Sequence, residues 1–201
     1  MGYYIRVLTT SEQPLPVPHL ETALRNDGLD ATLHVEAGTA QDWSQLALRH
    51  ADGTEIAALE RNPVGPGTMG AEELEEFSSE IEDERPASAV KWLKEFFSKV
   101  KCIYALQVLS GTGHGKGWDI LGRVKNTLHS AAPSILQADS EGFTNEAGYH
   151  ILWKFSDTVT GKWWMGVLKD DRWHQFQMDL GNRKHREAFW KGEIPQGAKL
   201  Q

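Results

Sequence analysis

The chain has 201 residues, 40% of them hydrophobic and 24% charged, which is the composition of a soluble globular protein. Its one cysteine, Cys102, excludes an internal disulfide framework and a cysteine-rich zinc site, so we expect a reducing, cytoplasmic compartment. Nucleic-acid binding is disfavoured because it needs a basic stripe, and the only concentrated one, Arg183, Lys184, Arg186 and Lys191, is interrupted by Glu187. The net charge is −7, and no apolar run approaches the roughly 20 residues of a membrane-spanning helix.

The charge is divided unevenly along the chain. Residues 1–100 hold eight basic and eighteen acidic side chains, a balance of −10, whereas residues 101–201 hold thirteen and ten, a balance of +3. Much of the acidic excess lies between Glu72 and Glu84, where no basic residue occurs. A solvated helix face explains this run, and an acidic surface that meets a basic partner is the alternative.

The first third of the chain predicts the order β-α-β-β-β. An asparagine, an aspartate and Gly28 end the helix, and the Asp52-Gly53 pair predicts a hairpin between the last two strands. The expected elements are a strand over 3–9, a helix from 17 to 26, and strands over 31–36, 43–50 and 54–61.

The middle third alternates helices with buried strands. Apolar residues at helical spacing predict a helix around 74–81 and a second one that Pro86 opens. The unbroken apolar run 102–109 predicts a central strand with both faces covered. A glycine-rich connection, a helix around 121–128 and a strand over 134–138 complete this part.

The last third predicts a tryptophan-rich β-meander. Apolar and polar residues alternate from Tyr149 to Phe155, and two further strands are expected over 163–169 and 173–180 around Asp170-Asp171. The whole pattern predicts an α+β fold, with a mostly antiparallel sheet and helices on one face. It resembles two similar ferredoxin-like β-α-β-β units, an acidic one over 1–84 and one with the meander over 85–201; a single compact domain is the alternative.

The glycine-rich segment Gly111–Gly117 is the first candidate site. A glycine-rich turn from a strand into a helix can direct backbone N–H groups at a phosphate. The spacing nevertheless departs from both the P-loop and the dinucleotide-binding motif, so a flexible connection is the plainer interpretation. If the loop binds an anion, its ligand-binding residues are Gly113, His114, Gly115 and Lys116.

Other catalytic and metal-binding patterns are incomplete. The carboxylates Asp139, Glu141 and Glu146 do not follow the calcium-loop pattern, and the eight histidines show no zinc-binding spacing. Cys102 lies in an apolar strand, where burial makes a thiol inert. We therefore predict no metal, no cofactor and no catalytic residue, and we lean away from an enzyme.

Adjacent tryptophans indicate a surface for a partner. Trp163 and Trp164 occupy successive positions of one expected strand, so they point to opposite faces and only one can enter a single core. The outward-facing tryptophan must be buried by another part of the chain, a ligand or a partner protein. Trp163, Trp164 and Arg172 are the expected interface, although packing between the two halves of the chain is the simpler explanation.

Two functions follow from these observations. The preferred one is a non-enzymatic protein-binding or inhibitor and immunity-type module that docks a protein partner or forms a homodimer. The alternative is an enzyme or sensor that holds a phosphate or another small anion in the glycine-rich loop.

Overall fold

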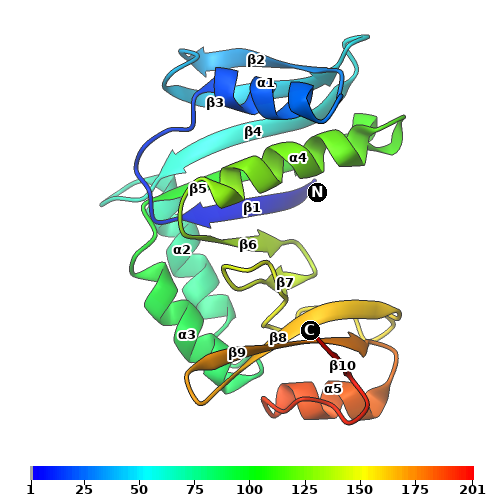
Figure 1. The fold of residues 1–201 in the computed structure, drawn as a ribbon. Helices are drawn as coiled ribbons and strands as arrows, with labels where there is room; N and C mark the ends of the chain where they lie inside the picture. Colours follow the sequence, from blue (N-terminus) through cyan, green and yellow to red (C-terminus); the bar gives the residue numbers. More distant parts are fainter. Residues whose placement is uncertain (1) are drawn as a thin grey trace. The chain divides into compact units, whose positions relative to one another are not determined.

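The computed structural model describes residues 2–201 and shows an α+β fold (Figure 1). Five α-helices accompany a seven-stranded antiparallel sheet and a three-stranded antiparallel sheet. The strand order in the larger sheet is β2-β3-β4-β5-β1-β6-β7, and in the smaller one it is β10-β9-β8. The predicted α+β class and the mostly antiparallel pairing are thus confirmed.

The contacts divide the chain into two compact units, each made from two stretches. Unit 1 comprises residues 1–71 and 100–134, and unit 2 comprises residues 72–99 and 135–201. This division differs from the sequence-based boundary after residue 84. Its cause lies in unit 1, where the strand formed by residues 102–108 pairs with strands of the first third of the chain on both of its sides.

Unit 1 is built around the buried strand β5. It pairs with β1 on one side and with β4 on the other, in continuous antiparallel register, as the unbroken apolar run predicts. The elements of unit 1 are β1 (Tyr3–Thr9), α1 (Val17–Asn26), β2 (Ala31–Gly38), β3 (Trp43–His50), β4 (Glu55–Pro63), β5 (Cys102–Val108), the 3-10 helix η1 (Ser110–Gly113) and α4 (Gly117–Ser130).

Helices α1 and α4 pack against each other on one face of the sheet (Figure 1). The apolar stripe of α1 consists of Val17, Leu20, Ala23 and Leu24, all buried, and Gly28 with φ +63° follows the helix end. The indole of Trp43 is fully buried beside the Tyr104 ring, and its N–H donates to the Leu15 carbonyl at 2.8 Å.

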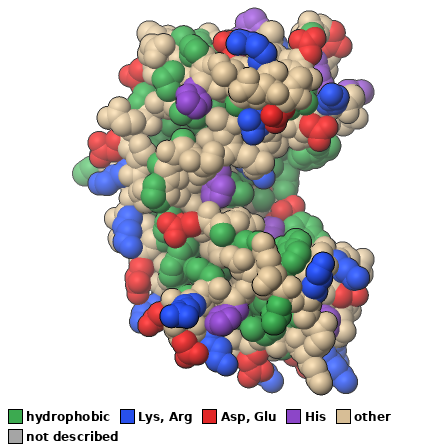
Figure 2. Space-filling model, in the orientation of Figure 1, with side chains coloured by type: hydrophobic (Ala, Val, Ile, Leu, Met, Phe, Trp, Pro, Cys, Tyr) green, Lys and Arg blue, Asp and Glu red, His purple; other side chains and the backbone are tan. Residues whose placement is uncertain are grey.

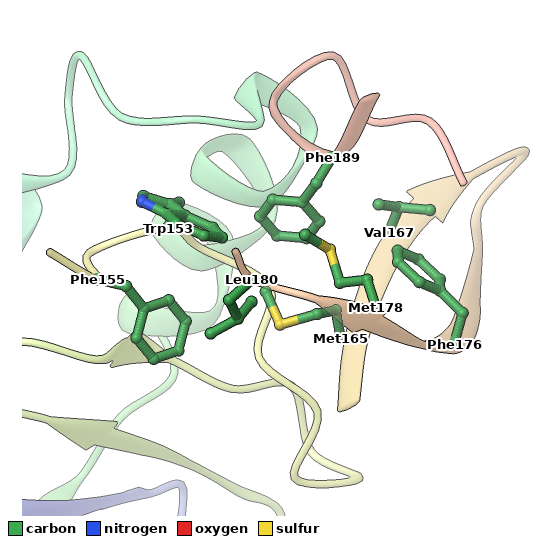
Figure 3. Packing of buried hydrophobic residues seen from close by; sticks show 8 residues of the cluster. All are labelled: Trp153, Phe155, Met165, Val167, Phe176, Met178, Leu180 and Phe189. Carbon is green, nitrogen blue, oxygen red and sulfur yellow. The ribbon is translucent and has the colours of Figure 1, made fainter. Parts of the chain in front are cut away.

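Unit 2 has its own apolar core, in which eight side chains gather between the three-stranded sheet and α5 (Figure 3). This core contains Trp153, Phe155, Met165, Val167, Phe176, Met178, Leu180 and Phe189. The elements of this part are α2 (Met69–Glu80), α3 (Ala87–Phe97), β6 (Ser134–Ala138), β7 (Gly142–Phe143), β8 (Lys162–Lys169), β9 (Arg172–Asp179), α5 (Arg183–Trp190) and β10 (Lys199–Leu200).

The strand predicted from Tyr149 to Phe155 is wrong. The backbone amides of this segment bind different partners: the N–H of Ile151 donates to the Phe143 carbonyl, and the N–H of Trp153 donates to the Arg85 carbonyl. Only His150 makes isolated bridges, to Thr144 and Met165. Because the segment lacks one continuous partner, no ladder forms, and Ile151, Leu152 and Trp153 are all buried instead of alternating.

The two strands that follow are confirmed, but they do not belong to a longer meander. β8 and β9 form a hairpin whose turn is Asp170-Asp171, both at positive φ (51° and 56°). The third strand of this sheet, β10, comes only after α5. The side chain of Asn182 begins α5 by accepting a hydrogen bond from the N–H of Lys184 at 3.0 Å.

Candidate functional site

The glycine-rich loop folds tightly onto the β3–β4 hairpin. A Cβ atom on Gly111 would lie 2.3 Å from the Glu55 carbonyl oxygen, and one on Gly117 would lie 2.4 Å from the Gly111 carbonyl oxygen. These two glycines are therefore required by close backbone packing. Gly113 ends the short helix η1, and a Cβ atom there would meet nothing within 4 Å.

His114 and Gly115 line an open hollow of about 420 Å³ beside that hairpin. Its other walls are Asp30, His50, Ala51, Asp52 and Thr54. The Nε2–H of His50 donates to the Gly111 carbonyl at 2.8 Å, because a carbonyl can only accept. The Thr54 N–H donates to the Asp52 carboxylate at 2.9 Å and lowers the pKa of that carboxyl group.

Lys116 faces a different hollow of about 690 Å³. It shares this space with Trp118, whose side chain is 54% exposed, and with Asp27 and Arg123, which form an ion pair at 3.1 Å. The structure thus brings His114 and Gly115 together but places Lys116 elsewhere. Several loop amides are also used internally, since those of Thr112, His114 and Gly117 donate to carbonyls of the same loop and its entry.

The two adjacent tryptophans of β8 point to opposite faces, and both are half-buried by their own unit. Trp163 contacts Phe155 and His150, with ring centroids 4.8 and 5.0 Å away. Trp164 meets Tyr149 edge-on at 6.1 Å. Arg172 is exposed at the start of β9, where it pairs with Lys169, whereas Trp163 and Trp164 pair with Met178 and Gln177 at the other end of the hairpin.

A second aromatic pair, which the sequence analysis did not identify, lines a hollow of about 580 Å³ in unit 2. Trp92 of α3 and Trp173 of β9 meet there at nearly a right angle, 87°, with ring centroids 5.2 Å apart. We call this space the tryptophan hollow. Its remaining walls are Ser88, Lys91, Glu95, Glu146, Leu168, Asp170 and Asp171.

The tryptophan hollow combines aromatic surface with negative charge. Four carboxylates line it and only one cation, Lys91, does so. Within residues 2–201 none of these four carboxylates takes part in an ion pair. Of the three loop carboxylates considered from the sequence, only Glu146 reaches this hollow. The sequence did contain one indication of this site. Trp92 is not among the buried residues that form the apolar stripe of its helix, so its side chain is available for a contact outside that stripe.

The described residues contain no group of three or more histidine, cysteine or carboxylate side chains arranged to hold a metal ion. Basic and acidic side chains are interspersed over the face drawn in Figure 2. No helix between residues 2 and 201 has the length and apolar character needed to cross a bilayer.

Comparison with known proteins gives no relative for this chain: no family model, no curated protein and no solved structure matches it.

Proposed function

We propose that the protein is a non-enzymatic protein-binding module whose unit 2 docks a basic segment of a partner protein in the tryptophan hollow. The single observation that carries this proposal is the pairing of Trp92 and Trp173 with four carboxylates that lack ion pairs. Tryptophan is enriched among the side chains that dominate binding energy at interfaces. Unneutralised carboxylates add attraction for a cationic partner and repulsion for an acidic one.

An inhibitor or immunity-type role and a homodimer both belong to this class, and a cytoplasmic location agrees with the single buried cysteine. The anion-binding alternative lacks an observation in its favour, because His114 and Lys116 line different hollows. Two carboxylates, Asp30 and Asp52, also stand beside His114, where they would repel an anion.

We also propose that the fold derives from two similar ferredoxin-like β-α-β-β units, namely β1-α1-β2-β3 and β5-α4-β6-β7. The order of elements along the chain supports this proposal. The first strand of each unit also lies beside that of the other, in antiparallel register, at the centre of the large sheet.

The test of the docking proposal is a titration of the full chain with pentalysine, with pentaglutamate as the opposite charge. We expect saturable binding of pentalysine only, weakened by salt because the attraction is electrostatic. The double variant Asp170→Asn/Asp171→Asn should weaken binding about five- to tenfold, in line with the loss of two attractive charges. Asparagine tolerates positive φ as aspartate does, so the turn is preserved.

The matched control is Glu12→Gln/Glu21→Gln, which removes the same two charges from unit 1. If both double variants weaken pentalysine binding equally, the attraction comes from net charge alone and the tryptophan hollow is not the docking site. Failure of pentalysine to bind the unaltered chain would overturn the proposal.

A further inference from the structure

Two indole rings stand nearly perpendicular to each other in the wall of the tryptophan hollow. Trp92 stacks on Phe96, with centroids 5.4 Å apart and planes 26° apart, and Phe96 is itself buried in the apolar stripe of α3. Trp173 meets Trp92 at 87° and is paired through β9 with Leu168 of β8, which also lines the hollow. The two indoles therefore form a nearly right-angled corner in the wall of the hollow.

The carboxylates around this corner come from three separate segments. Glu95 belongs to α3, Glu146 to the loop after β7, and Asp170 and Asp171 to the β8–β9 turn. All four carboxylates that line the hollow are exposed. Carboxylates from several segments suit a compact ammonium charge, which does not need to form two parallel hydrogen bonds with a single carboxylate as a guanidinium does.

We propose that the tryptophan hollow holds one alkylammonium head group, that of a lysine side chain, free or N-methylated, in the docked segment; this inference rests on the proposed function. An ammonium is a compact charge on a flexible stem and can contact both walls of the corner. The attraction of a cation to a tryptophan ring is the strongest among the aromatic side chains. A planar guanidinium stacks along one ring and meets the other wall only with its edge.

The experiment follows the indole N–H resonances of the ¹⁵N-labelled full chain while single-residue probes are added. The probes are the N-acetyl methylamides of lysine, trimethyllysine, arginine and norleucine. We expect lysine or trimethyllysine to shift the Trp92 and Trp173 resonances saturably, with the arginine probe at least about threefold weaker and norleucine without effect. The stronger of the two ammonium probes identifies the free or the methylated form as the ligand.

The resonances are assigned with Trp92→Phe and Trp173→Phe, and Trp164→Phe is the control outside the hollow. Dispersed amide spectra verify that each variant is folded, and Asp170→Asn/Asp171→Asn supplies a second test that leaves both rings in place. We expect this charge variant to weaken the ammonium probe at least about threefold.

The outcomes separate this inference from the proposed function. If pentalysine binds but no ammonium probe shifts Trp92 or Trp173, docking of a basic segment stands and the single head-group site is overturned. Equal shifts with arginine overturn the selectivity for ammonium. If pentalysine also fails, both proposals fall together.

Discussion

Cys102 and Tyr104 show how burial in the central strand controls chemistry at single residues. Desolvation raises the pKa of the Cys102 thiol from its ordinary value of 9.0 to about 11, and that of the Tyr104 hydroxyl from 10.0 to about 12. Both side chains remain protonated in the folded protein at neutral pH. The prediction that Cys102 packs and does not react agrees with this raised pKa and with its burial.

These two pKa values predict alkaline destabilisation. The folded state keeps the Cys102 proton up to about pH 11 whereas the unfolded chain releases it above about pH 9, so the free energy of unfolding falls as pH rises between those values. Denaturant titrations at steps from pH 8 to 11 measure the slope. Cys102→Ala should flatten it between pH 9 and 10 and leave the decline that Tyr104 causes above pH 10. An unchanged slope in Cys102→Ala would contradict this assignment.

At the scale of elements, two glycines of the glycine-rich connection differ in how much space surrounds them: Gly111 is tightly packed and Gly113 is not. Alanine at Gly111 would place its Cβ against the backbone of Glu55, which cannot move without disturbing the hairpin. We expect Gly111→Ala to lower the free energy of unfolding by about 1–3 kcal/mol, as overpacking does. Gly113→Ala faces open space and should change it by less than about 0.5 kcal/mol. Chemical denaturation of both variants measures the difference, and similar losses would show that the close approach to Glu55 is relaxed in solution.

Most elements were predictable because their signals are local. The Asp52-Gly53 hairpin, the Pro86 helix start and the apolar run of β5 each depend on neighbouring residues, and all three are confirmed. The strand prediction for residues 149–155 was wrong because an irregular segment that several elements bury can show the same alternation of apolar and polar residues. Helix α5 was not predicted, although Asn182 is a recognisable N-cap, because its basic residues were considered only as a possible phosphate-binding stripe.

The candidate site could be predicted only in part for a related reason. Asp170-Asp171 was identifiable as a turn and Trp92 as an aromatic residue off the apolar stripe of its helix. Their meeting depends on α3 packing near β8 and β9, which are about 80 residues distant along the chain. Hydrophobic periodicity describes windows of about 11–18 residues, so it cannot indicate a contact between residues that far apart in the sequence. Glycine content marks the glycine-rich loop as a candidate site in the sequence, but the close packing of Gly111 and Gly117 against backbone atoms depends on the three-dimensional fold.

At the scale of the whole molecule, the discontinuous units predict how fragments behave. A fragment of residues 1–84 contains β1 and β4 but lacks β5, which is the partner of both. We expect this fragment to be unfolded or aggregated, with collapsed amide dispersion in its NMR spectrum, whereas the full chain folds. A folded 1–84 fragment would mean that the N-terminal boundary inferred from the sequence marks an independent domain.

The position of β5 between β1 and β4 also governs the order in which a ribosome can complete the protein. Strands β1 to β4 all emerge before β5, yet β1 and the facing edge of β4 lack their β5 partner until residues 102–108 have been synthesised. At about 5–20 residues per second, the roughly 40 residues that separate β4 from β5 correspond to an interval of a few seconds. During that interval the nascent chain exposes a pairing edge, which is the state in which chaperone contact or misassembly between neighbouring nascent chains would occur.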